Sequence, residues 1–249
     1  MRLHVLNSGS SANGYVLYND REALVIECGV PYSQCLLAVG FHRERIVGAI
    51  LSHGHGDHCK YVDQYLEAGI KVCASEGTIE EMKPYLKKKV IPPVAVANQK
   101  MLQLGGFKVL PFDTQHDSAE PFGYLVFHEE MGQILFATDT YYLKYKFAGL
   151  THVMIECNYA TDIIERNVEE NVIPKFVKER VNRSHMSLET TISTLQANDL
   201  SNVNTVVLLH LSGNNSDPAA FKKAVEEATG KLVFVAEKGL DIPFNKELI

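Results

Sequence analysis

Four side chains that can bind a metal ion lie within six residues, in the run His53–His58 with the sequence HGHGDH. Neutral imidazole and carboxylate groups are ligands that zinc and similar divalent ions take in proteins. The two glycines between them let the backbone bend so that alternate side chains converge. A polar surface loop with a chance run of histidines is the alternative, and the position of the run directly after a buried strand argues against it.

Further residues that can bind a metal or move a proton lie at the ends of other predicted elements. Loops at strand ends are where α/β proteins place their chemistry. We therefore expect these side chains to meet the His53–His58 run at one edge of the sheets. They are His116, Asp139 and His210, each after a predicted strand, and His185, just before a predicted helix.

The elements that must position these residues are short strands interleaved with helices. Continuous apolar runs such as Val47–Leu51 and Thr205–Leu209 are typical of strands buried on both faces. Pro174 lies inside the predicted helical segment Ile163–Arg180 and implies a break or a kink there. Asp217 is the expected N-cap of the last helix. The other predicted strands are Leu3–Leu6, Tyr15–Tyr18, Ala23–Glu27, Lys71–Ala74, Met101–Leu104, Phe107–Phe112, Tyr124–His128, Ile134–Ala137, Val153–Glu156 and Lys231–Val235, and the other predicted helices are Pro31–Val39, Lys60–Ala68, Ile79–Leu86, Ser187–Ala197 and Pro218–Thr229.

These strands and helices fall into two halves, and each half has its own set of strands. Two sheets packed face to face, with helices outside, would account for this order. The sequence contains no linker, internal repeat or low-complexity tract. We therefore predict an α/β protein in which residues 1–249 form a single domain.

Composition and charge restrict the classes of function. The sequence has 249 residues, 46% hydrophobic and 22% charged, which is ordinary for a globular protein. The net charge of −6 argues against a whole surface built to attract nucleic acid, but it allows a local basic stretch such as Lys175–Arg183. Five scattered cysteines without CxxC spacing fit a reducing cytoplasm. Because no signal peptide or membrane-spanning run is evident, we expect a cytoplasmic protein without a membrane partner.

The run His53–His58 resembles the HxHxDH motif of the metallo-β-lactamase superfamily, and the later candidates come in the order that this family uses. The resemblance covers essentially the whole chain. It implies an αββα sandwich, which is two mixed β-sheets with helices on the outer faces. It also implies two divalent metal ions, with zinc favoured and manganese as the alternative. The implied ligands are His53, His55 and His116 for one ion and Asp57, His58 and His210 for the other, with Asp139 bridging both.

Other segments resemble the YycJ/WalJ-like branch of this superfamily, which is related to ribonuclease Z. The segment Ser8–Asn13 is similar to the SGSSGN start of that branch, with Ala12 in place of a glycine. Ser184–Ser187 and Leu209–Ser212 are similar to its GHVS and AHLS segments. The Ile155–Tyr159 segment is similar to its ESNHD-like segment, although Tyr159 stands where that pattern has a histidine.

The Gly/Ser-rich turn at the start of the chain is a candidate substrate-binding segment. Such turns can bind a phosphate through their backbone N–H groups. The alternative is an ordinary hairpin turn between two strands. The family resemblance favours substrate binding, and the residues concerned are Ser8, Ser10, Ser11 and Asn13.

His185 distinguishes between reaction types within the superfamily. Phosphodiesterases like ribonuclease Z carry a histidine at this point, where it resembles a general acid, and lactamase-type hydrolases usually do not. Cleavage of a phosphodiester expels an alkoxide, which needs a proton, and an imidazole with a pKa near neutrality can supply one. The alternative is a histidine that caps the helix beginning at Ser187.

These features together predict a metal-dependent phosphodiesterase or nuclease, with an exonuclease as one form. A metal-bridging hydroxide would attack phosphorus, and Asp57 and His185 would be the catalytic residues. The predicted partner is a nucleic acid or nucleotide substrate, and a homodimer is left open. The alternatives are a cyclic-nucleotide phosphodiesterase, a hydrolase of thioesters or lactones that does not need His185, and a metal-stabilised scaffold without enzymatic activity.

Overall fold

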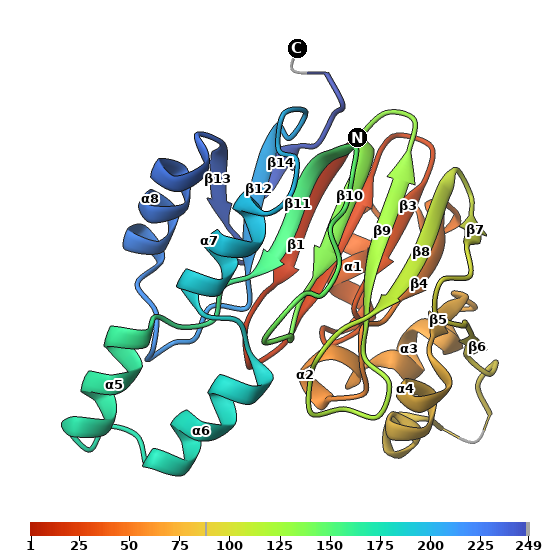
Figure 1. Cartoon of the computed structure of the whole chain (residues 1–249). Helices are drawn as coiled ribbons and strands as arrows, with labels where there is room; N and C mark the ends of the chain where they lie inside the picture. Colours follow the sequence, from red (N-terminus) through yellow and green to blue (C-terminus); the bar gives the residue numbers. More distant parts are fainter. Residues whose placement is uncertain (88, 248–249) are drawn as a thin grey trace.

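The computed structural model describes residues 1–87 and 89–247. Two seven-stranded sheets pack face to face, and helices cover their outer faces (Figure 1). This arrangement confirms the αββα sandwich expected from the sequence. Among the described residues, no helix is both long enough and apolar enough to cross a membrane.

The first sheet combines an antiparallel and a parallel part. Its order is β14-β1-β2-β3-β4-β5-β6, and pairing is antiparallel as far as β3 and parallel from β3 to β6. The strands β3 and β4 carry almost only buried residues, as their apolar sequences predict. The bounds are β1 (Arg2–Asn7), β2 (Gly14–Tyr18), β3 (Ala23–Ile26), β4 (Ile46–Ile50), β5 (Val72–Ala74), β6 (Val94–Ala95) and β14 (Asp241–Pro243).

The second sheet repeats this plan with the order β13-β12-β11-β10-β9-β8-β7. Pairing is parallel from β13 to β10 and antiparallel from β10 to β7. Every residue of the central strands β11 and β12 is buried. The bounds are β7 (Leu102–Leu104), β8 (Phe107–Asp113), β9 (Phe122–His128), β10 (Gly132–Ala137), β11 (Leu150–Glu156), β12 (Thr205–Leu209) and β13 (Leu232–Val235).

Three apolar layers hold the sandwich together. The central layer lies between the sheets and includes Tyr15 and Phe136, whose rings are 5.7 Å apart in an edge-to-face arrangement. The second layer joins the first sheet to α1 (Tyr32–Ala38), α3 (Val62–Glu67) and α4 (Glu76–Glu81). The third joins the second sheet to α5 (Thr161–Glu169), α7 (Leu188–Gln196) and α8 (Pro218–Thr229).

Several predicted helices have different bounds in the structure. The predicted helical segment Ile163–Arg180 is interrupted in the structure: α5 ends at Glu169, and α6 (Lys175–Ser184) begins after Pro174. The break at Pro174 is confirmed, because proline has no N–H to continue a helix. Asp217 is the N-cap of α8 as predicted, with its carboxylate accepting from two backbone N–H groups.

Short elements account for the remaining differences. The metal-binding run is not a loop throughout, because α2 (Gly56–Cys59) begins inside it. The predicted helix Ile79–Leu86 is divided between α4 and a 3₁₀ turn at Lys83–Tyr85, and a second such turn covers Arg43–Arg45. The short strands β6 and β14 were not predicted.

The pairing directions place the carboxyl ends of ten strands at one end of the molecule, and seven of these strands lead into the residues of the site. Within the first sheet these are β1, β3 and β4, and within the second they are β8, β10, β11 and β12. Both chain termini lie at the opposite end (Figure 1). Helices α5 and α6 extend beyond the carboxyl ends and are joined by an ion pair of 3.0 Å between Glu165 and Lys178 (Figure 1).

Candidate metal centre

The first ligand run is held in place by backbone contacts from neighbouring strand ends. The carbonyl of Asp57 accepts from Asn13 N at 2.7 Å, and the carbonyl of His58 accepts from Cys28 N at 2.7 Å. Gly29 packs so tightly here that a Cβ atom would lie 1.7 Å from the Asp57 carbonyl oxygen. Only a glycine fits at that position, and it lets α2 approach the end of β3.

Two groups of candidate donor atoms contain the predicted ligands, and a third, made of Asp139, Glu156, His185 and His210, overlaps the second. The members of each group lie within 4.8 Å of one another. Within the first group, His116 Nε2 lies 3.1 Å from His55 Nδ1. Two atoms that are each about 2.1 Å from a tetrahedral zinc ion lie about 3.4 Å apart. The separations therefore have the size expected for donors that share an ion. The first group is His53, His55 and His116, and the second is Asp57, His58, Asp139 and His210.

Asp139 lies between the two groups, with one carboxylate oxygen facing each. Its Oδ2 is 3.9 Å from His53 Nε2 and 3.7 Å from His116 Nε2. Its Oδ1 is 3.4 Å from His58 Nε2 and 3.8 Å from His210 Nε2. This is the placement that a carboxylate bridging two cations requires.

Unsatisfied nitrogen atoms test whether the donor set fits a cation. The Nδ1 of His53 contacts Ser52 Oγ at 2.9 Å, while its buried Nε2 has no hydrogen-bond partner among the described residues. His116 Nδ1 donates to the carbonyl of Ser184 at 2.8 Å, so Nε2, which faces His55, is the unprotonated nitrogen of the neutral ring. A buried polar atom without a partner costs about 1–3 kcal/mol. A divalent cation would remove that cost, so these residues fit one.

The electrostatics of the cluster favour cations. Burial lowers the pKa of His53 well below its usual range and also lowers that of His116, so both rings are neutral as ligands must be. Burial opposes ionisation of Asp139, but His210 and His58 lower its pKa by more. Burial also lowers the pKa of His210, but Asp139 and Asp57 outweigh this and raise it to about 10. Protons thus occupy the second group until a cation displaces them.

His185 lies beside both groups and is held by a buried glutamate. Its Nδ1 is 2.6 Å from Glu156 Oε1, and its ring is stacked on that of His210 with centroids 5.3 Å apart. Burial lowers the pKa of His185, but the Glu156 carboxylate outweighs this and raises it above the usual value. The helix-capping alternative is not supported, since Ser187 caps α7 with its own side chain.

Two glutamates and one asparagine were missing from the predicted site. Glu156 also accepts from Thr140 N at 2.8 Å and Met186 N at 3.2 Å. Glu27 lies 3.4 Å from His58 Nδ1. Asn158 Nδ2 donates to the His210 carbonyl at 2.8 Å. The sequence did contain a signal for the two glutamates, because each stands at the end of an otherwise apolar strand. A buried carboxylate destabilises the fold unless its charge has a partner.

The Gly/Ser-rich turn is placed differently from the prediction. Ser8 Oγ accepts from His210 N at 2.9 Å, and the fully buried Asn13 donates from Nδ2 to Asp57 Oδ2 at 3.2 Å. Their polar atoms already bond within the protein, so these two residues hold candidate ligands instead of lining a cavity. Ser10 is exposed and does line the cavity at the metal centre, whereas Ser11 lines a separate depression.

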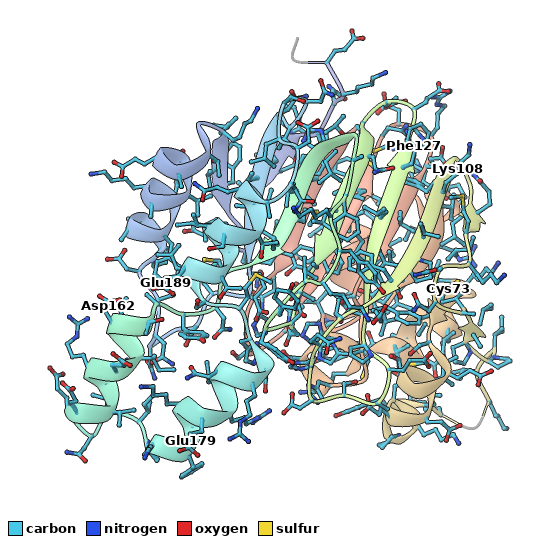
Figure 2. The ribbon with its side chains drawn as sticks, viewed as in Figure 1. Cys73, Lys108, Phe127, Asp162, Glu179 and Glu189 are labelled. Atoms are coloured by element: carbon cyan, nitrogen blue, oxygen red, sulfur yellow. The ribbon has the colours of Figure 1, made fainter. Side chains whose placement is uncertain are left out.

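The metal centre opens into a cavity of about 570 Å³. One wall carries the candidate ligands and His185, and the opposite wall is formed by α6 and the segment that precedes it. A cavity of this size, with polar groups converging on one wall, is typical of a small-molecule or substrate site. Figure 2 shows α6, on which Glu179 is labelled, beside the carboxyl ends of the strands.

The fold and the His/Asp cluster define a metal-dependent hydrolase. The profile of the metallo-beta-lactamase superfamily matches residues 8–146, which is more than half of the chain. The protein therefore belongs to the metallo-β-lactamase superfamily.

Relatives within this superfamily are distant. The exodeoxyribonuclease WalJ of Streptococcus pneumoniae is 24% identical over 174 residues, which cover 64% of this chain and 63% of the relative. The match thus spans less than two thirds of that protein's length. The metallo-beta-lactamase fold protein YhfI of Bacillus subtilis has a TM-score of 0.74 at 16% identity, covering 97% and 98% of the two chains. Human tRNase Z, short form, has a TM-score of 0.60 at 15% identity, covering 98% and 99%. Both structural likenesses concern the fold alone.

Proposed function

We propose that this protein is a metal-dependent phosphodiesterase that cleaves nucleic acid, with residues 1–249 acting as one hydrolase domain. The observation that carries the proposal is His185, which lines the cavity, bonds to Glu156 and stacks on the candidate ligand His210. A proton donor at this place serves a reaction with a poor leaving group. The likeness to an exodeoxyribonuclease supports the same class of substrate, with exonuclease activity as one form.

The metal ligands in this proposal are the residues of the two groups, with Asp139 shared between them. Zinc is the favoured ion, because five of the seven donors are imidazoles, and manganese is the alternative. Two such cations would supply Lewis acidity toward the phosphoryl oxygens and activate water. Asp57 is partly exposed and faces the cavity, where its carboxylate can orient the attacking water.

His185 then acts as the general acid. Its Nδ1 proton is held by Glu156, which fixes the orientation of the ring. Its Nε2 makes no hydrogen bond within the described residues 1–87 and 89–247, so this nitrogen is free to hold a proton toward the leaving oxygen. The Glu156 carboxylate raises the pKa of His185 above its usual value, which favours the protonated form that a general acid needs.

The experiment is a cleavage assay with the purified protein loaded with zinc or manganese. The substrates are end-labelled single- and double-stranded DNA and RNA. We expect metal-dependent cleavage, and a loss of about 10²–10⁴-fold in His185→Ala at unchanged metal content. The matched control is His42→Ala, because His42 is an exposed histidine that precedes β4, whereas the candidate ligands follow that strand. Full metal content without cleavage of any of these substrates would overturn the proposal.

A cyclic-nucleotide phosphodiesterase is the second candidate, and the volume of the cavity favours it. About 570 Å³ is within the range that small-molecule ligands occupy. Competition between cyclic nucleotides and oligonucleotides for the same enzyme separates the two substrates. Hydrolysis of a thioester or lactone is the remaining alternative, and it predicts that His185→Ala keeps nearly full activity.

A further inference from the structure

The wall opposite the metal centre is one face of a helical segment. The cavity-lining residues of this segment recur every three or four positions, which is the spacing of side chains on one side of an α-helix. They line the same cavity as the candidate ligands. These residues are Ile173, Phe176, Val177, Arg180 and Val181.

Phe176 is the most unusual member of this face. Its side chain lines the cavity, yet it is 70% exposed. The neighbouring Val177 is half-buried and lines the same cavity, so the exposed ring adjoins an apolar side chain. An exposed phenyl ring beside a cluster of histidines and carboxylates offers a flat surface on which a base can stack.

The charges of α6 match an anionic ligand. Its ten residues include four basic side chains and one acidic side chain, in a protein with a net charge of −6. Arg180 is the basic residue of α6 that lines the cavity. Its Nε lies 3.3 Å from Asp117 Oδ2, and both side chains are well exposed, at 68% and 44%. An ion pair this exposed contributes little to stability, so a phosphate can replace Asp117 as the partner of Arg180.

The same helix is attached to the reacting groups at its C-terminal end. The carbonyl of Ser184, the last residue of α6, accepts from His116 Nδ1, and His185 follows directly. A ligand seated on α6 is therefore aligned with a candidate metal ligand and with the candidate general acid. Misplacement of a substrate by about 1 Å can cost 10²-fold in rate, which makes such an alignment valuable.

We propose that α6 is the nucleotide-recognition wall of this enzyme, with Phe176 stacking on one base of a single strand and Arg180 contacting an adjacent phosphate. The inference rests on the proposed phosphodiesterase function and names its substrate as unpaired nucleic acid. A base must be out of a duplex to lie flat on Phe176. Single strands are therefore cleaved in preference to duplexes.

The test combines Phe176→Ala with oligonucleotides that carry one abasic site, moved stepwise from the end of the strand. Loss of a base stack is expected to raise KM roughly tenfold with kcat little changed. On the oligonucleotide that lacks the stacked base, Phe176→Ala and the wild type have equal KM. Phe176→Tyr restores the wild-type KM on intact strands.

Arg180→Gln tests the phosphate contact independently. We expect a higher KM on every oligonucleotide, whatever its abasic position, and a salt dependence of binding reduced by about one phosphate contact. Phe127→Ala is the aromatic control, because Phe127 is also exposed but lies on β9 far from α6 (Figure 2).

Two outcomes are distinguishable. If the metal-loaded wild type cleaves no nucleic acid, the proposed function fails and the inference with it. If the wild type cleaves oligonucleotides but Phe176→Ala raises KM equally on intact and on all abasic strands, or not at all, the phosphodiesterase stands and the recognition wall is overturned.

Discussion

The two halves of the molecule build their share of the metal centre in different ways. The first half supplies four candidate ligands from one run of six residues, fixed by backbone hydrogen bonds to Asp57 and His58. The second half gathers His116, Asp139 and His210 from the ends of three separate strands. The first contribution is local in sequence, whereas the second exists only when the second sheet is assembled.

A buried glutamate ends one strand in each half, and the two differ in what they hold. Glu27, after β3, faces His58 Nδ1 at 3.4 Å, and His58 belongs to a candidate ligand group. Glu156, at the end of β11, contacts His185 at 2.6 Å and lies 3.6 Å from His210 Nδ1. We therefore expect Glu27 to support metal binding alone and Glu156 also to control the proton of His185.

Replacement of Asp139 should have the largest effect, because this residue joins the two halves. Asp139→Asn removes a negative charge that faces both ligand groups. We expect activity to fall by more than the 10²–10³-fold that removal of one charge-stabilising group costs. Metal content per chain, measured by mass spectrometry, should fall as well. Asp241→Asn, at the opposite end of the sandwich, is the control, and retention of both ions in Asp139→Asn would refute the bridging role.

Removal of the metal should affect the second half more than the first. At a free metal concentration 100 times Kd, binding stabilises the folded state by about 2.7 kcal/mol, which corresponds to about 5–10 °C in Tm for a chain of this size. Chelation should therefore lower Tm by that amount in calorimetry. Hydrogen exchange should increase at residues 138–140 and 210–213 more than at residues 53–58. Equal increases in the two halves would contradict the proposed difference between them.

Glu156→Gln should change the pH profile. The carboxylate raises the pKa of His185, so the protonated acid persists to higher pH and activity declines only as pH rises through that raised pKa. Without the negative charge, burial lowers the pKa of His185. The alkaline limb of the pH profile, where activity declines, therefore moves to lower pH. We expect kcat to fall about 10–100-fold at pH 8. Glu189→Gln, on α7 (Figure 2), is the control. If the alkaline limb does not move in Glu156→Gln, Glu156 is excluded as the residue that positions the acid.

Glu27→Gln should have the smallest effect and a different signature. We expect metal affinity to fall about tenfold, since supporting partners of ligand histidines have effects of this order. Excess metal should restore activity, and the alkaline limb should stay in place. The measurements are a metal titration and a pH profile at saturating metal. A shifted limb in this variant would mean that the two glutamates are equivalent.

Sequence alone determined the class of fold and the chemistry of the first ligand run. Apolar runs such as Val47–Leu51 specify buried strands because burial of apolar side chains dominates folding, and this information is local. The spacing of HGHGDH is local as well. The break at Pro174 was also predictable, since the missing N–H acts on the backbone of that residue alone.

Only the tertiary structure decided which distant residues meet. In the sequence, Glu156 is simply the last residue of an apolar strand. In the structure, its four polar partners come from segments that lie up to 54 residues away in the chain. Asn13 was predicted to contact substrate and instead bonds to Asp57, 44 residues away. The cavity wall on α6 could not be predicted from the sequence either, because the side of a helix that faces a site depends on how the helix packs. Contacts of this kind depend on the pairing of whole sheets, which no local pattern encodes.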